Sequence, residues 1–139
     1  MRAKMLSVFA VIAGALLMTA VPMPAHHSFS AEYDKQKPVT LKGTVTKVEW
    51  MNPHARFYVD VKDDATGKVT NWEFELGSPN GLMRQGWTRN SLKEGDQVTV
   101  AGSRAKDGAN LANATSVTMA NGKGVFRGQV AGENPDAQQ

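Results

Sequence analysis

The sequence has no cysteine among its 139 residues, and it lacks the motifs of the common enzyme classes. Without cysteine the domain forms no disulfide, so packing has to supply its stability even in an oxidising compartment. No serine nucleophile motif is present, and the glycines in segment 77–81 lack the lysine and the spacing of a phosphate loop. We therefore expect a protein that is not an enzyme, and we assign no catalytic residue.

A concentrated excess of positive charge is missing as well. The whole chain has 16 basic and 13 acidic residues, but Arg2 and Lys4 belong to a leader segment described below. Without these two, 14 basic residues face the same 13 acidic ones, which gives a net charge of +1. A nearly neutral domain has no basic face for a phosphate backbone, so no nucleic acid is expected as a partner.

The sequence also lacks an apolar run long enough to cross a bilayer. The apolar stretch 6–18 follows a basic start and is shorter than the roughly 20 residues that a spanning helix needs. Small and helix-breaking residues follow it and end at Ala25. This order predicts a signal peptide over residues 1–25 and a periplasmic protein with no transmembrane segment after cleavage. Cleavage after Ala25 is favoured over cleavage after Ala20, and it makes His26 the mature N-terminus.

Alternation of apolar and polar residues predicts where the mature chain forms strands. The mostly polar stretch 26–37 indicates an extended N-terminal arm, and the first strand begins at Pro38. The apolar phase of this strand slips by one residue, which predicts a β-bulge near Thr46 and Lys47. The later predicted elements are strands over 56–62, 70–76 and 111–119, a strand around Val98 and Val100, a short helix over 79–86 that Ser78 caps, a turn over 63–68, and a final hairpin towards Val125 and Phe126.

Five strands with a short helix between the third and the fourth predict an all-β fold. This order is that of a small OB-fold-like, five-stranded Greek-key barrel, which we expect over residues 38–128. A sandwich of the same strands is the alternative. The tail, residues 129–139, is polar and is expected to be disordered.

Several short motifs extend over nearly the whole mature chain. They are AHHSF at 25–29, KGTV at 42–45, WMNPHARF at 50–57, WEFE at 72–75, GSPNGL at 77–82, RAKDG at 104–108 and LANA at 111–114. On these motifs the chain resembles a bacterial domain-of-unknown-function family of small exported proteins, the DUF6152 type. The resemblance implies an exported single domain and supplies no activity.

All three histidines of the sequence lie in two of these motifs. At a mature N-terminus, the α-amine and the imidazole of His26 can chelate one metal ion together, and His27 or His54 can add a further nitrogen. Imidazole suits copper, zinc and nickel, and we favour a copper site of the histidine-brace type. The alternative is that His26 and His27 only end the arm, while His54 bonds its own loop.

The corner between the first two strands carries further candidate ligands. Trp50 and Met51 precede His54, and some periplasmic OB-fold copper carriers bind cuprous ion with histidine, methionine and an overlying tryptophan. Packing in the core or at its rim is the preferred interpretation of both residues. Arg56 and Tyr58 share the outward face of the second strand, where OB barrels bind extended ligands. An ordinary solvent-facing strand is the preferred interpretation of this face. A metal-independent module for a partner protein, a peptide, a glycan or another small ligand is therefore the competing hypothesis.

Two carboxylates alternate with the apolar residues of the third predicted strand. Glu73 and Glu75 lie about 7 Å apart by strand rise, a spacing that an acid–base pair can use. A solvated outer face is the preferred interpretation of the pair.

The leader prediction has a direct test in N-terminal sequencing of the exported protein. We expect the first residue to be His26, because the small residues that follow the apolar run end at Ala25. A first residue of Val21 would instead place the cut after Ala20 and remove the terminal histidine chelate.

Overall fold

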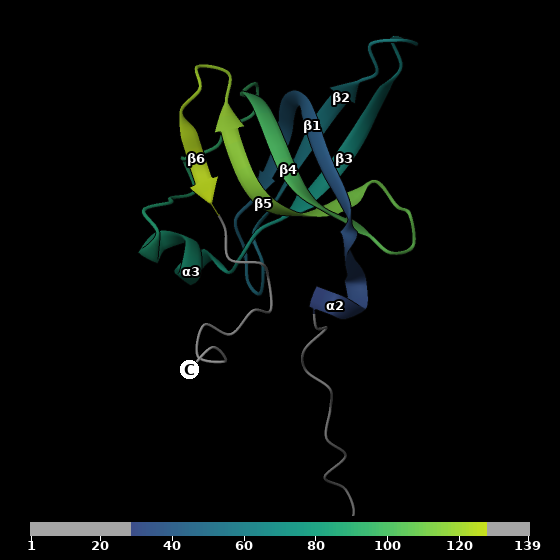
Figure 1. Ribbon diagram of the computed structural model, residues 1–139. Helices are drawn as coiled ribbons and strands as arrows, with labels where there is room; N and C mark the ends of the chain where they lie inside the picture. The colour runs from purple at the N-terminus through teal and green to yellow at the C-terminus, as the bar shows by residue number, and fades with distance from the viewer. Residues whose placement is uncertain (1–28, 128–139) are drawn as a thin grey trace, which may run out of the picture.

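The fold is a ring of strands built around the long first strand, as the computed structural model of residues 29–127 shows (Figure 1). The ring order is β1–β2–β3–β5–β4, and a parallel pairing between β3 and β5 closes it. This closure confirms the predicted small all-β, OB-fold-like barrel. The elements are α2 (Phe29–Glu32), β1 (Tyr33–Glu49), β2 (Arg56–Lys62), β3 (Val69–Glu75), α3 (Pro79–Arg84), β4 (Gln97–Ala105), β5 (Leu111–Met119) and β6 (Gly124–Arg127).

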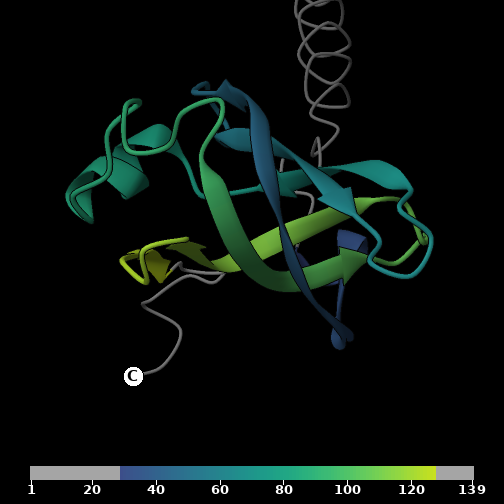
Figure 2. The same cartoon turned by 90° about the horizontal axis from the view of Figure 1, so that it is seen from above.

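β1 pairs antiparallel with β2 along one edge and with β4 along the other, and it runs across the whole barrel (Figure 2). The bulge predicted in this strand is present, because the register with β2 shifts between Val45 and Lys47. Val45 is buried in the core, and Val48 packs against the core from the other side of the shift. The bulge thus lets apolar residues of both phases face inward.

β1 begins at Tyr33 rather than at the expected Pro38. Residues 29–32 of the predicted arm form the single turn α2, and Tyr33 then pairs with Ala105 of β4. The rings of Phe29 and Tyr33 stack with their centroids 5.5 Å apart, and they pack with Ala105 and Leu111 in a second small apolar cluster. This apolar cluster packs residues 29–33 against the outer face of the barrel.

The core fills the interior of the barrel. Phe57 and Phe74 are fully buried and stack at a centroid distance of 5.2 Å. The predicted helix α3 is present, and the Ser78 hydroxyl accepts a hydrogen bond from the Gly81 N–H at 3.2 Å. Leu82 of this helix is buried in the same core and so anchors α3 to it.

Three predictions concern residues outside the described part of the chain. They are the leader 1–25, the start of the arm with His26 and His27, and the tail 129–139. The predicted final hairpin lies within the described part and is confirmed, because β6 pairs antiparallel with β5. Among residues 29–127, no helix is long and apolar enough to span a membrane.

Gly43 tests the close approach of β1 and β2. A Cβ atom at this position would lie 2.1 Å from the carbonyl oxygen of Asp60 and 2.7 Å from a methyl carbon of Val59. We expect Gly43→Ala to lower the free energy of unfolding by roughly 1–3 kcal/mol, measured by urea denaturation. Gly77→Ala is the matched control, because a Cβ there meets no atom within 4 Å. Equal stability of the two variants would contradict this packing constraint.

Candidate functional site

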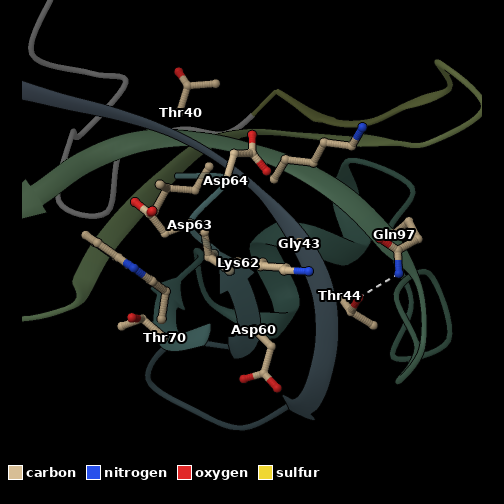
Figure 3. A pocket seen from close by; sticks show the side chains of 13 residues that line it. Thr40, Gly43, Thr44, Asp60, Lys62, Asp63, Asp64, Thr70 and Gln97 are labelled. Carbon is tan, nitrogen blue, oxygen red and sulfur yellow. Dashed lines mark hydrogen bonds between the residues drawn. The ribbon is translucent and has the colours of Figure 1, made fainter. Parts of the chain in front are cut away.

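One hollow of about 810 Å³ lies where β1, β2 and β3 meet the β2–β3 turn (Figure 3). Its polar side chains serve local structure. Asp63 accepts hydrogen bonds from the backbone N–H groups of Ala65 and Thr66 at 3.1 and 2.7 Å. Gln97 Nε2 donates to Thr44 Oγ1 at 2.6 Å, the dashed bond in Figure 3. These contacts shape a turn and a strand edge, so we assign no ligand to this hollow.

A second hollow, of about 520 Å³, lies between α2, the start of β2 and the β4–β5 turn. Glu32 and Arg56 both line it. Four buried or half-buried polar side chains lie next to Arg56 on the same outer face of the barrel. We call them the polar cluster: Tyr33, His54, Glu75 and Asn113.

Strand pairing places Glu75 and Asn113, two members of the polar cluster, side by side and next to Arg56. Glu75 lies opposite Arg56 of β2 on one side and opposite Asn113 of β5 on the other. Ala55 is fully buried in the core, and its N–H donates to the carbonyl oxygen of Gly77 at 3.0 Å, which extends the β2–β3 pairing by one step. His54 therefore faces outward, diagonally across from Glu75, at a separation that longer side chains can bridge.

Helix α2 and Tyr33 cover this outer face. Lys106 fastens the covering segment, because its N–H donates to the carbonyl oxygen of Glu32 at 2.9 Å and its Nζ donates to that of Ser30 at 2.5 Å. Beneath the cover, the exposed fraction of Glu75 is only 5% and that of Tyr33 is 2%. The prediction that both strand carboxylates face solvent is therefore wrong for Glu75. It was wrong because the cover comes from residues far away in the sequence.

Arg56 links Glu75 of the polar cluster to Glu73, a half-buried carboxylate that also lies on β3. Its Nη1 lies 3.0 Å from Glu73 Oε1, and its Nη2 lies 3.4 Å from Glu75 Oε2. Burial raises the pKa of the Glu75 carboxyl, and the nearby positive charges of His54 and Arg56 offset this only in part. Glu75 is thus a buried carboxyl group, and its ion pair with Arg56 is long.

Tyr33 shares that environment. Burial raises the pKa of its phenol above the ordinary value, and the negative charge of Glu75 raises it further. The phenol lies close enough to Glu75 to sense this charge, although its hydroxyl makes no hydrogen bond of normal geometry. The hydroxyl therefore stays protonated, and among the nearby charges that of Glu75 has the largest effect on its pKa.

The polar cluster contains all the buried side-chain nitrogen and oxygen atoms without a hydrogen-bond partner that the described residues show. They are Tyr33 Oη, His54 Nδ1, and the amide nitrogen and oxygen of Asn113. Each such atom typically costs about 1–3 kcal/mol when it is left unpaired. Native proteins pair nearly all of these groups with protein, water or ligand atoms, so their concentration at one place makes the polar cluster the candidate functional site.

The polar cluster supplies only part of a metal site. Within residues 29–127, no group of three histidine, cysteine, aspartate or glutamate side chains could hold a metal ion. His54 and Glu75 can offer two ligands from the cluster. The other predicted metal ligands, His26 and His27, lie outside the described residues, so the structure does not test them.

The polar side chains of the predicted ligand face bond neighbouring side chains of the barrel. Tyr58 Oη donates to Glu49 Oε2 at 3.1 Å, and Arg56 is occupied by the two carboxylates of β3. Trp50 packs against the core, whereas Met51 is 55% exposed. The interpretation of packing in the core or at its rim is therefore right for Trp50, whereas the mostly exposed Met51 lies outside the core.

Sequence reasoning missed Tyr33 and Asn113 as members of the site. One signal was available for Tyr33. Phe29 and Tyr33 are aromatic residues in an otherwise polar stretch, and such rings usually pack against other apolar side chains. No comparable signal marked Asn113. Its burial depends on the cover over the outer face, which strand alternation does not show.

The sequence profile of a family of unknown function, DUF6152, matches residues 14–114. The chain belongs to this family. The match confirms the resemblance seen in the motifs and covers every member of the polar cluster. No curated protein and no solved structure has a significant match to the chain. The chemistry of this DUF6152 domain therefore has to be argued from its own residues.

The buried carboxyl gives this DUF6152 domain a predictable response to pH. Because its pKa is raised, Glu75 contributes stability below its unfolded-state pKa, and this contribution is lost as the pH rises through the folded-state pKa. Glu75→Gln cannot ionise. We therefore expect the free energy of unfolding of the variant, relative to the natural protein, to improve as the pH rises from 3 to 8, measured by urea denaturation with a chelator present. A difference that stays constant with pH would contradict the assignment.

Proposed function

We propose that this protein is an exported, periplasmic metal-binding protein, with copper as the favoured metal. Its site joins the mature N-terminal residue His26 to His54, with His27 as a further nitrogen ligand. The observation that carries the proposal is His54 Nδ1, a buried ring nitrogen without a hydrogen-bond partner among the described residues.

The state of His54 argues against a purely structural role. A histidine that only stabilises its own loop uses a ring nitrogen to bond a nearby backbone or side-chain group. His54 Nδ1 bonds no such group within residues 29–127, although it is buried. A metal ion would use the lone pair of this nitrogen and remove the free-energy cost of leaving it unpaired.

The position of α2 supports a joint site with the N-terminal histidines. His27 precedes Phe29 by two residues, a length of chain that spans at most about 7 Å. The ring of Phe29 stacks on Tyr33, and Tyr33 lies within electrostatic range of Glu75. The chain thus enters the described fold beside the polar cluster, which is the entry that a joint site needs.

The ligand chemistry favours copper. An α-amine and imidazoles form a nitrogen-rich donor set, for which divalent copper has a higher intrinsic affinity than nickel or zinc. All of these donors must lose a proton before they bind, so the affinity should fall as the pH falls. Zinc and nickel are the less favoured occupants.

A metal-independent module for a partner protein, a peptide or a glycan is the second candidate. The OB-type barrel favours it, since related barrels bind extended ligands on the outer face of β2 and β3. Against it, Trp72 and Trp87 are buried, so neither ring is free to stack on a ligand. Pull-down from a periplasmic extract separates the candidates: specific capture that survives a chelator supports the module, and capture that needs metal supports the metal site.

Cupric ion titration of the mature protein tests the metal site. We expect one tight equivalent for the protein that begins at His26. Adding one glycine before His26, or replacing His54 with Ala, should each weaken binding by about tenfold or more, since even outer contacts of metal sites have effects of this size. Lys123→Ala, in an exposed turn remote from the polar cluster, is the control. Undiminished affinity in the extended protein would rule out the terminal chelate, and undiminished affinity in His54→Ala would rule out the joint site.

A further inference from the structure

We propose that residues 29–33, which cover the polar cluster, act as a lid that opens about a hinge at residues 34–37 while the barrel stays closed. The proposal goes beyond the metal site, because it concerns access to the polar cluster and holds for any molecule that the cluster takes up. Every residue on which it rests lies within the described part of the chain.

The cover packs in an apolar cluster that is separate from the barrel core. Phe29 and Tyr33 contact Ala105 and Leu111 there, and none of these four residues belongs to the core inside the barrel. The stack of the Phe29 and Tyr33 rings lies within the cover itself, so it moves with the cover. Opening therefore separates the cover from Ala105 and Leu111 and leaves the core packed.

Residues 34–37 form the hinge, because the β1–β4 pairing gives them no opposite residues. β1 advances by five residues between Tyr33 and Pro38, whereas β4 advances by only two, between Ala105 and Ser103. The pairing is continuous from Pro38 to the end of its register. A change of backbone angles within 34–37 can thus move the cover while the rest of β1 stays paired with β4, as in other hinged lids.

The cover also has space beside it. Ala31 and Glu32 of α2 line the second hollow, of about 520 Å³, together with Lys106 and Asp107 of the β4–β5 turn. The two hydrogen bonds from Lys106 hold the cover at this turn. When these bonds break, the cover can move into the hollow without displacing a strand.

The polar groups beneath the cover favour opening, because water can bond them only when the cover is open. Tyr33 Oη and both polar side-chain atoms of Asn113 have no hydrogen-bond partner among the described residues. The contact of the buried Glu75 with Arg56 is 3.4 Å long. Hydration of these groups offsets part of the free energy that is lost with the contacts of the cover. We therefore expect the open state to require much less free energy than global unfolding.

Native-state amide hydrogen exchange, measured by NMR at a fixed pH with a chelator present, detects the opening. The Lys106 N–H donates to Glu32 of the cover at 2.9 Å, whereas the Val45 N–H donates to Asp96, next to β4, at the same distance. After correction for intrinsic rates, we expect the Lys106 N–H to exchange at least about tenfold faster than that of Val45. Low concentrations of urea should accelerate exchange at Val45 and leave Lys106 almost unchanged, because opening of the cover exposes little surface.

Phe29→Ala tests the apolar contact of the cover. Loss of this ring, which is 8% exposed, should lower the protection of the Lys106 N–H by about tenfold or more and change that of Val45 by much less. Met83→Ala is the matched control, because Met83 is 51% exposed and lies on α3. The control should change the protection of either N–H by less than about threefold.

An introduced cysteine shows whether the opening reaches the polar cluster, since the natural chain has no thiol. Asn113→Cys places a thiol beneath the cover, and Ala112→Cys places one in the adjacent barrel core. With a small alkyl thiosulfonate, Asn113→Cys should react at least about tenfold faster than Ala112→Cys, and adding Phe29→Ala should accelerate only the former. Circular dichroism shows whether each variant folds, and exchange in the natural protein tests the lid without any substitution.

Three outcomes would overturn the lid. Equal protection and equal urea dependence of the Lys106 and Val45 N–H groups would mean that the cover opens only together with the barrel. An equal loss of protection at both groups in Phe29→Ala would mean the same. If Asn113→Cys reacted no faster than Ala112→Cys while Lys106 exchanged rapidly, movement of the cover would not open the polar cluster. None of these outcomes depends on metal binding, so each is distinguishable from a failure of the proposed function.

Discussion

The short parallel pairing between β3 and β5 is the constraint on which the rest of the structure depends. It joins β3, at one edge of the sheet, to β5 and so closes the sheet into a barrel, with β6 outside the ring. The same pairing sets Glu75 beside Asn113, two polar residues that would otherwise lie on separate strand edges. The pairing that closes the barrel therefore also brings Glu75 and Asn113 together. A substitution that separates β3 from β5 would disrupt both the barrel and the polar cluster.

A second layer of residues shields the outer face of the β3–β5 pairing from water. Phe29 and Tyr33 pack with Ala105 and Leu111, and this small apolar contact lies over the outer face of β4 and β5. Outer faces of small barrels are ordinarily wet, and a carboxylate there is solvated. Here the cover removes water from Glu75 and raises its pKa. The burial and the raised pKa of Glu75 thus arise from the covering residues 29–33 rather than from the barrel itself.

The parts of the fold that sequence predicted are those that local chemistry determines. Strand alternation, the bulge near Thr46 and Lys47 and the Ser78 cap each depend on a few neighbouring residues, and the structure contains all of them. The start of β1 and the burial of Glu75 depend on contacts between distant segments, which periodicity cannot show. For the site, His54 stood out in the sequence, whereas its neighbours did not. The roles of His26 and His27 remain predictions, because both lie outside the described residues.

The two hydrogen bonds from Lys106 to Ser30 and Glu32 also determine whether Glu75 stays covered. Four residues are too few for a helix that is stable in water by itself, so α2 depends on its contacts with the barrel. Loss of these two bonds would loosen the cover and let water reach the buried carboxyl group while the barrel stays closed. The cover and the barrel thus differ in local stability.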